Sequence, residues 1–352
     1  MKRQLIFKLI SFTLGTALAL LLAEVVYRAY HYVVYVDLTS IDIGNKPHFI
    51  VPDEEVPLGQ MIQRSGVKDI VYELIPNSTY KYKGVPVATN SNGFRCPDFT
   101  KKKQGNTRRI VGLGDSVMFG WGVNEEECYL SQLESELNHQ DSVHYEVINT
   151  GVPGYNTVME VATLAQKFDL SEVDMVIINF VGNDFELPDF IRTKPNNYLT
   201  LQESFIINRF KRSDEIQMKL EGNLFGKSEA DFKDGLDKLP PEYRRLLGLS
   251  NYIRAMEELK EMSVKYGFEV LVLETQISYE LPEFLPATCE RLGFELLQMK
   301  KVWEKYKTEH PDAQWELSAA DAHPTPLGHR IIAEELLKRL LKNEPTASLT
   351  TH

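Results

Sequence analysis

Short apolar runs alternate with helically spaced apolar residues from residue 109 to the end of the chain. The runs predict strands at 110–113, 145–149, 175–180 and 268–273. The spaced segments predict helices at 125–138, 157–169, 251–266 and 291–307, followed by a last helix that starts at Thr325-Pro326. Strands that alternate with crossover helices predict an α/β fold in which a parallel sheet lies between two layers of helices.

The remaining segments divide the chain around this main domain, residues 109–342. Residues 37–108 lack a long helical period and contain turn signals, so they predict a small strand-rich region that ends in a solvated connector at 101–106. Within the main domain, residues 185–248 are longer than a usual connection. They form either a lid that faces the substrate or a helical excursion without substrate contact. Residues 343–352 are expected to be a flexible tail.

Residues 1–36 are expected to form an N-terminal membrane segment. Leu9–Ala23 is apolar and uncharged, but as a helix it spans only about 22 Å, less than the hydrocarbon core of roughly 30 Å. The stretch Leu5–Tyr27 is long enough if Lys8 extends to the headgroups and Glu24 lies near the far interface.

The charges beside this segment predict its orientation. The basic residues before it are Lys2, Arg3 and Lys8, whereas Arg28 follows it. We therefore expect the N-terminus in the cytoplasm and the chain after residue 36 outside, in the periplasm or the extracellular space. The alternative is a cleaved secretory signal with its processing site at Ala17-Leu18-Ala19. Both interpretations export the rest of the chain.

The composition restricts the partners of the protein. A net charge of -11 argues against nucleic acid, because phosphate contacts need a basic surface, and it suits a neutral substrate better. The cysteines are Cys96, Cys128 and Cys289. They lack the paired spacing of a zinc site, and they form either one disulfide at most or three buried thiols. No metal or organic cofactor is implied.

Polar residues follow the first three predicted strands, and a histidine precedes the last helix. Ser116 follows the first strand, at the edge where open α/β sheets bind ligands. Gly151-Val152-Pro153-Gly154 and Asn183 follow the next two strands and offer donors to a developing oxyanion. Pro324 forces His323 into an extended conformation. Each piece alone is typical of a turn or cap, but together they supply a nucleophile, two donors and a base.

These segments resemble the SGNH hydrolases, also called the GDSL family, over about residues 90–340. The matching motifs are Gly114-Asp115-Ser116, Phe119-Gly120-Trp121-Gly122-Val123, Asn149-Thr150-Gly151-Val152-Pro153-Gly154, Gly182-Asn183-Asp184, and His323-Pro324 with Gly328-His329. Asn92-Gly93-Phe94-Arg95 is similar to a motif of the membrane-anchored bacterial members. The resemblance implies a three-layer α/β/α sandwich of the flavodoxin-like type.

The resemblance also implies roles for individual residues. Ser116 would be the nucleophile and His323 the general base. The oxyanion would be held by the N–H groups of Ser116 and Gly154 and by the side chain of Asn183. Behind these groups, Asp115 and Asp184 would support the site.

The chain departs from the family pattern at two positions. Val181 occupies the first glycine position of the usual Gly-x-Asn-Asp block. The family usually places its acid three residues before the histidine, and that position is Ala320 here. Asp321 is the nearest substitute, so the site is either a triad completed by Asp321 or a dyad of Ser116 and His323.

The combined interpretation is a serine-dependent ester hydrolase, either an acylhydrolase or a deacetylase. It would act outside the cytoplasm on an O-acyl ester of a small molecule or a carbohydrate. An O-acyltransferase that modifies a cell-envelope polysaccharide would use the same residues. A catalytically idle carbohydrate-binding protein is the further alternative if Asp321 does not orient His323.

Overall fold

The computed structural model describes residues 2–36, 55–140, 143–188, 204, 206–207, 226–232, 239, 241–276, 281–318 and 321–342. The predictions for residues 37–54, for most of the 185–248 insertion and for the 343–352 tail lie outside the described residues. Ala320, where the family usually has its acid, lies outside them as well.

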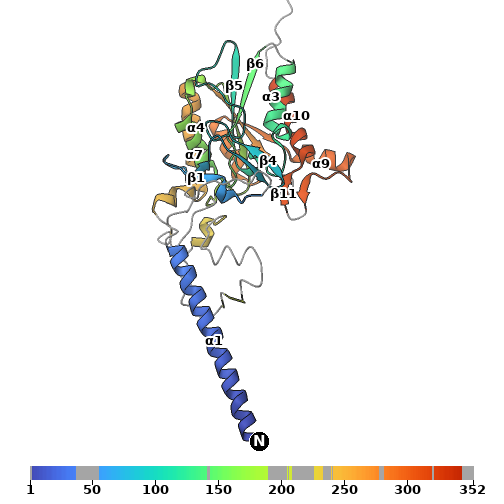
Figure 1. Ribbon diagram of the computed structural model, residues 1–352. Coiled ribbons are helices and arrows are strands. Elements are labelled where there is room, and N and C mark those ends of the chain that lie inside the picture. Colours follow the sequence, from blue (N-terminus) through green and yellow to red (C-terminus); the bar gives the residue numbers. More distant parts are fainter. Residues whose placement is uncertain are drawn as a thin grey trace, which may run out of the picture.

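A parallel sheet forms the centre of the main domain (Figure 1). It has five strands in the order β6-β5-β7-β8-β9. Its strands are β5 Thr107–Leu113, β6 His144–Asn149, β7 Met175–Phe180, β8 Glu269–Glu274 and β9 Glu295–Gln298. Numbered along the chain, this is the order 2-1-3-4-5 of flavodoxin-like folds. The predicted α/β class with a parallel sheet is therefore confirmed.

Helices cover both faces of the sheet (Figure 1). One layer contains α4 Thr157–Lys167, α7 Leu249–Tyr266 and α8 Phe284–Leu292. The other layer contains α3 Tyr129–Gln140, α9 Lys300–Glu309 and α10 Pro326–Lys342. Successive strand residues point to opposite faces, so Ile110 packs with α3 and α10 whereas Val111 packs with α4 and α7. This double burial explains why runs of consecutive apolar residues occur within the strands, such as Ile110–Val111 in β5 and Leu271–Leu273 in β8.

The predicted helix at 291–307 is confirmed only in part, because the residues between the end of α8 and the start of α9 do not form a helix. In the structure α8 ends at Leu292, and Gly293 caps it in a left-handed conformation. Residues Glu295–Gln298 then form β9, which pairs with the edge of the sheet at β8, before α9 starts at Lys300. Pairing with an open sheet edge is a long-range interaction, and here it overrides the local helical spacing.

Shorter elements surround the sheet. Two antiparallel pairs precede it, formed by β1 Ile62–Arg64 with β2 Tyr72–Leu74 and by β3 Thr79–Tyr82 with β4 Val85–Ala88. A third pair, β10 Glu316–Ser318 with β11 Asp321–Pro324, precedes α10. One short helix, α2 Ser116–Phe119, follows β5. The 3-10 turns are η2 Leu58–Gln60, η3 Glu125–Glu127, η4 Leu170–Glu172, η5 Glu229–Phe232 and η7 Pro241–Leu246.

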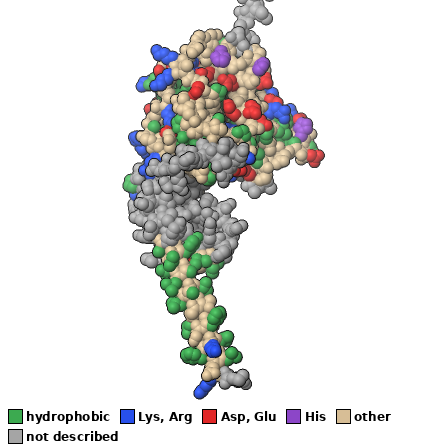
Figure 2. All heavy atoms as spheres, viewed as in Figure 1, with side chains coloured by type: hydrophobic (Ala, Val, Ile, Leu, Met, Phe, Trp, Pro, Cys, Tyr) green, Lys and Arg blue, Asp and Glu red, His purple; other side chains and the backbone are tan. Residues whose placement is uncertain are grey.

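The N-terminal segment forms one helix, α1 Lys2–Val36. Its stretch Arg3–Ala29 has a mean hydropathy of 2.1 and is not buried, so it is long and apolar enough to cross a membrane. Figure 2 shows hydrophobic side chains along this helix and basic side chains at its N-terminal end. Length and composition alone do not distinguish an anchor from a signal sequence.

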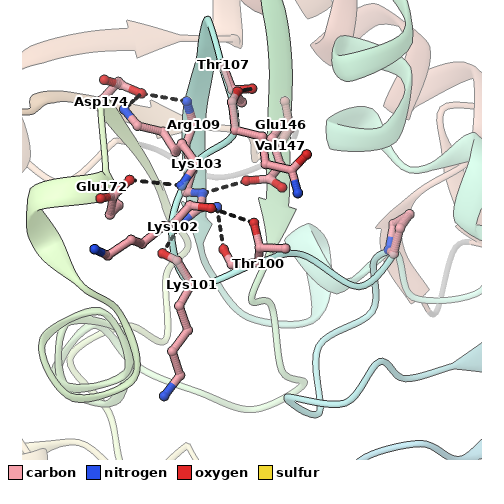
Figure 3. A network of polar contacts seen from close by, with 12 residues as sticks. Thr100, Lys101, Lys102, Lys103, Thr107, Arg109, Glu146, Val147, Glu172 and Asp174 are labelled. Carbon is pink, nitrogen blue, oxygen red and sulfur yellow. Dashed lines mark hydrogen bonds and ion pairs between the residues drawn. The ribbon is translucent and has the colours of Figure 1, made fainter.

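A network of ion pairs around Arg109 ties the connector before β5 to the sheet (Figure 3). The Arg109 side chain is 2% exposed, contacts Glu146 Oε2 at 2.5 Å and donates to the carbonyls of residues 100 and 101. Lys103 Nζ lies 2.6 Å from Asp174 Oδ2, and the Lys103 N–H donates to Glu172. The prediction of a solvated connector is therefore wrong for Lys103, because these long-range partners are not visible in the local sequence.

We expect Arg109→Ala to lower the free energy of unfolding by about 2 kcal/mol, because it leaves partly buried acceptors without their donor. Arg108→Ala is the matched control, since Arg108 pairs with Glu269 at 3.6 Å on the surface, and it should cost less than about 0.5 kcal/mol. Urea unfolding of the full chain in detergent measures both. Equal losses would show that the buried network does not stabilise the fold.

Candidate active site

Ser116 is placed by a sharp turn at the carboxyl end of β5. Asp115 caps α2, because its Oδ1 accepts a hydrogen bond from the Val117 N–H at 2.9 Å. Ser116 is the first residue of that helix and is 9% exposed, and its Oγ lies 3.2 Å from Asp115 Oδ2. The hydroxyl is therefore held at the sheet edge where the chain reverses direction.

His323 and Asp321 approach Ser116 from β11. His323 Nε2 lies 2.7 Å from Ser116 Oγ, and His323 Nδ1 lies 2.5 Å from Asp321 Oδ1. Serine, histidine and aspartate thus form one continuous hydrogen-bonded chain. This is the geometry of a nucleophile, a general base and an acid that orients the base.

The environment of Asp321 favours its ionised form. Burial acts to raise the pKa of Asp321, but the hydrogen bonds and charge of His323 and the Trp121 N–H outweigh it, so the pKa lies below its usual value. An ionised carboxylate accepts the imidazole N–H and stabilises the imidazolium that forms when the ring takes a proton.

Trp121 contacts both members of this pair, and sequence reasoning assigned it no role. Its Nε1–H donates to Asp321 Oδ2 at 3.1 Å. Its ring stacks on the His323 ring, with centroids 4.7 Å apart and planes inclined by 9°. Trp121 belongs to the family motif at residues 119–123, but its partners lie about 200 residues away along the chain.

A cleft of about 300 Å³ opens beside Ser116. Its lining residues are Asp115, Ser116, Val117, Val181, Asn183, Thr275, Gln276, Asp321, Ala322, His323 and Pro324. The structure thus brings Ser116, His323 and Asn183 to one cleft. Gly154 is not among the described residues that line it, so its role as an oxyanion donor stays a prediction. The described part of the 185–248 insertion contributes no lining residue either.

Two buried carboxyl groups, Asp115 and Asp184, lie behind these residues, together with Glu160 of α4. Burial raises the pKa of Asp115, whereas burial and the charge of Asp115 hold the pKa of Asp184 well above its usual range. Burial and the charges of Asp184 and Asp115 do the same for Glu160. The Val181 N–H donates to Asp184 Oδ2 at 3.1 Å, which closes the turn that carries Asn183. This contact fits the supporting role predicted for Asp184.

Asn149 and Gly151 join the loop after β6 to α2, the short helix that begins at Ser116. Asn149 Nδ2 donates to the Met118 carbonyl at 2.9 Å, and Asn149 Oδ1 accepts from the Gly151 N–H at 2.9 Å. A Cβ on Gly151 would lie 2.5 Å from the Phe119 nitrogen, so only glycine lets the two backbones approach this closely.

No metal site accompanies this arrangement in the part of the chain that the structure describes. Among those residues, no group of three or more His, Cys, Asp or Glu side chains is arranged to hold an ion. The cysteines, Cys96, Cys128 and Cys289, are free thiols.

Comparison with known proteins identifies the family. The profile of the GDSL-like lipase/acylhydrolase family matches residues 113–331, more than half of the chain. The chain therefore belongs to this family of SGNH-type esterases and acylhydrolases. The resemblance inferred from the sequence motifs is confirmed. No curated protein matches the sequence.

Several solved structures are similar to the chain. TesA is 13% identical, with a TM-score of 0.39 over 66% of this chain and 98% of its own. A putative lipolytic protein of the G-D-S-L family from Desulfitobacterium hafniense is 14% identical, with a TM-score of 0.40 over 65% of this chain and 98% of its own. The lipase/acylhydrolase from Enterococcus faecalis is 15% identical, with a TM-score of 0.39 over 66% of this chain and 95% of its own.

We expect Gly151→Ala to lower kcat by about tenfold or more, because the added methyl group displaces the α2 backbone beside Ser116. Overpacking of this kind should also cost about 1–3 kcal/mol of stability. Gly66→Ala is the control, since a Cβ there meets nothing within 4 Å. Ester hydrolysis and thermal melting of both variants test the prediction. Unchanged kcat in Gly151→Ala would show that the loop does not position the nucleophile.

Proposed function

We propose that the protein is a membrane-anchored serine esterase that hydrolyses an O-acyl ester outside the cytoplasm. Membership of the family supports the class of reaction. The observation that carries the residue assignment is the continuous chain from Ser116 through His323 to Asp321, with contacts of 2.7 and 2.5 Å.

In the proposed mechanism, Ser116 Oγ attacks the ester carbonyl while His323 Nε2 takes the hydroxyl proton. The negative charge moves to the carbonyl oxygen, where the N–H groups of Ser116 and Gly154 and the Asn183 amide stabilise it. His323 returns the proton to the departing alcohol, which leaves an acyl group on Ser116. Water, activated by His323, then releases the acid and regenerates the serine hydroxyl.

The size and chemistry of the cleft favour a short acyl group on a polar carrier. A volume of about 300 Å³ is at the lower end of small-molecule sites. Asn183, Thr275 and Gln276 add polar groups to the catalytic residues in its lining. An acetyl ester of a carbohydrate satisfies both conditions, so we propose deacetylation as the reaction.

The alternative of an idle carbohydrate-binding protein assumed that Asp321 does not orient His323. The 2.5 Å contact between their side chains argues against that alternative. Transfer to a sugar hydroxyl would use the same residues, and an assay with an added acceptor separates it from hydrolysis.

The proposed location rests on α1. Its apolar stretch Arg3–Ala29 is long enough to span a bilayer, and basic residues gather at its N-terminal end. We infer that α1 stays attached as an anchor and that the main domain faces outward.

Ser116→Ala should preserve the fold and lower turnover of an acetyl ester by several orders of magnitude, because the covalent route is lost. The wild type should hydrolyse the acetyl ester faster than its octanoyl counterpart. A serine-directed organophosphonate should label the wild type and spare the variant, as mass spectrometry of the intact chain can measure. Labelling that persists in Ser116→Ala would place the nucleophile elsewhere.

A reporter enzyme that is active only outside the cytoplasm should be active when it is fused after residue 352 of the full chain, because the charges around α1 favour an outward main domain. The matched control replaces Lys2, Arg3 and Lys8 by glutamine, which should reduce that activity. A silent fusion beside a working cytoplasmic reporter would reverse the proposed orientation.

A further inference from the structure

We propose that Trp121 is a positioning residue that holds Asp321 and His323 in their working orientation. The inference rests on the catalytic roles proposed above for that pair. Nothing in the family match assigns a role to Trp121. Its contacts with both side chains carry the argument.

The two oxygens of Asp321 have different partners. Oδ1 lies 2.5 Å from His323 Nδ1, and Oδ2 accepts from Trp121 Nε1 at 3.1 Å. A carboxylate that is held at both oxygens cannot rotate about its terminal bond without losing a hydrogen bond. The indole Nε1–H of Trp121 therefore fixes the plane of the Asp321 carboxylate. This also fixes the position of Oδ1, the oxygen that contacts His323 Nδ1.

The indole ring restrains the imidazole as well. The two rings are stacked, with centroids 4.7 Å apart and planes 9° from parallel. Stacking on a flat, fixed surface keeps the imidazole from turning about its outer side-chain bond. Nε2 then stays directed at Ser116 Oγ, 2.7 Å away.

The base and acid need this outside support because of where they lie in the fold. Both belong to β11, a four-residue strand that pairs with β10 alone among the described strands and has an irregular register. Their side chains are 23% and 32% exposed, for His323 and Asp321 respectively. A two-stranded ribbon is only marginally stable by itself, so a rigid partner outside the ribbon is required to fix its side chains.

Trp121 is that rigid partner because it lies on the turn that ends α2, the helix that begins at Ser116. Gly120 caps α2 with a φ of 84°, a left-handed conformation that favours glycine, and the Trp121 N–H donates to the Ser116 carbonyl at 3.1 Å. The carbonyl of Gly120, the residue before Trp121, accepts from the buried Arg95 at 2.7 Å. One short turn therefore carries the nucleophile at its start and the support for the base at its end.

The outer surroundings of Trp121 complete its placement. Tyr82 of β3 packs edge-on against the indole, with centroids 5.2 Å apart. Lys83 Nζ lies 4.4 Å from the indole centroid, within the range of a cation–π contact. Among the described residues, the charged and titratable groups that contact the indole are Tyr82, Lys83, His323 and Asp321, with Asp115 beside Ser116.

The test uses two substitutions in the full chain, purified in detergent, with an acetyl ester as substrate. Trp121→Phe keeps a ring for stacking but removes the N–H, and we expect kcat to fall about tenfold with KM changed less than about twofold. Trp121→Leu removes both contacts and should lower kcat about a hundredfold. Trp315→Phe is the control for loss of a buried indole, and it should leave kcat within about twofold.

The pH profile separates positioning from a general loss of stability. Removing a donor from a carboxylate raises its pKa, so Trp121→Phe should move the acid limb of kcat/KM to higher pH. Activity at low pH is then lost earlier than in the wild type. A merely structural role would lower the melting temperature without moving that limb.

A double-mutant cycle with Asp321→Ala tests whether Trp121 acts through the carboxylate. If it does, Trp121→Phe should cost less than about twofold when Asp321 is already absent. Losses that multiply in the double variant would overturn the proposal. So would an unchanged kcat and pH profile in Trp121→Phe while His323→Ala and Asp321→Ala are strongly impaired, and in that case the proposed function survives. If His323→Ala and Asp321→Ala both keep full activity, the proposed function itself fails.

Discussion

The guanidinium group of Arg95 holds the end of α2, the short helix that begins at Ser116, and the arrangement of the candidate site depends on that contact. Arg95 is fully buried and donates to the carbonyls of Phe119, Gly120 and Val123 at 2.9, 2.7 and 2.7 Å. A helix of four residues cannot stabilise itself, and its terminal carbonyls need donors. A buried cation whose two terminal nitrogens donate to carbonyl oxygens meets that need. The strand-rich region before the main domain thereby becomes part of the site.

The order of the strands brings the remaining groups to the same edge. β5 lies between β6 and β7, so the loops after these three strands are neighbours at the carboxyl end of the sheet. Ser116 follows β5, the loop Gly151-Val152-Pro153-Gly154 follows β6, and Asn183 follows β7. At β5 the strand order reverses, so the connections that follow neighbouring strands run to opposite faces of the sheet. This leaves a crevice at the carboxyl ends of the strands. The proposed nucleophile and the candidate oxyanion donors follow strands of the sheet, whereas the proposed base and acid come from β11, outside it.

The spacing of apolar residues along the sequence predicts those strands and helices that bury a regular apolar face. The strands at 175–180 and 268–273 and the helix at 251–266 are signalled by their apolar spacing, and the structure has β7, β8 and α7 at these places, within two residues. β9 was missed because it forms by pairing with the edge of β8, and its short sequence carries no strand period. Trp121 was missed for the same kind of reason, since its partner Asp321 is 200 residues away. The local sequence around β9 and around Trp121 does not reveal these distant partners.

The spacing of Asp321 and His323 shows how the strand itself produces the site geometry. Side chains two residues apart on a strand point to the same side, and residues three apart point to opposite sides. Asp321 and His323 both lie in β11 and are both partly buried, while Ala322 between them is exposed. Their separation by one residue therefore brings a carboxylate beside its imidazole without any turn. An acid three residues before the histidine would need the chain to bend, so the departure from the family spacing agrees with an extended backbone at this position.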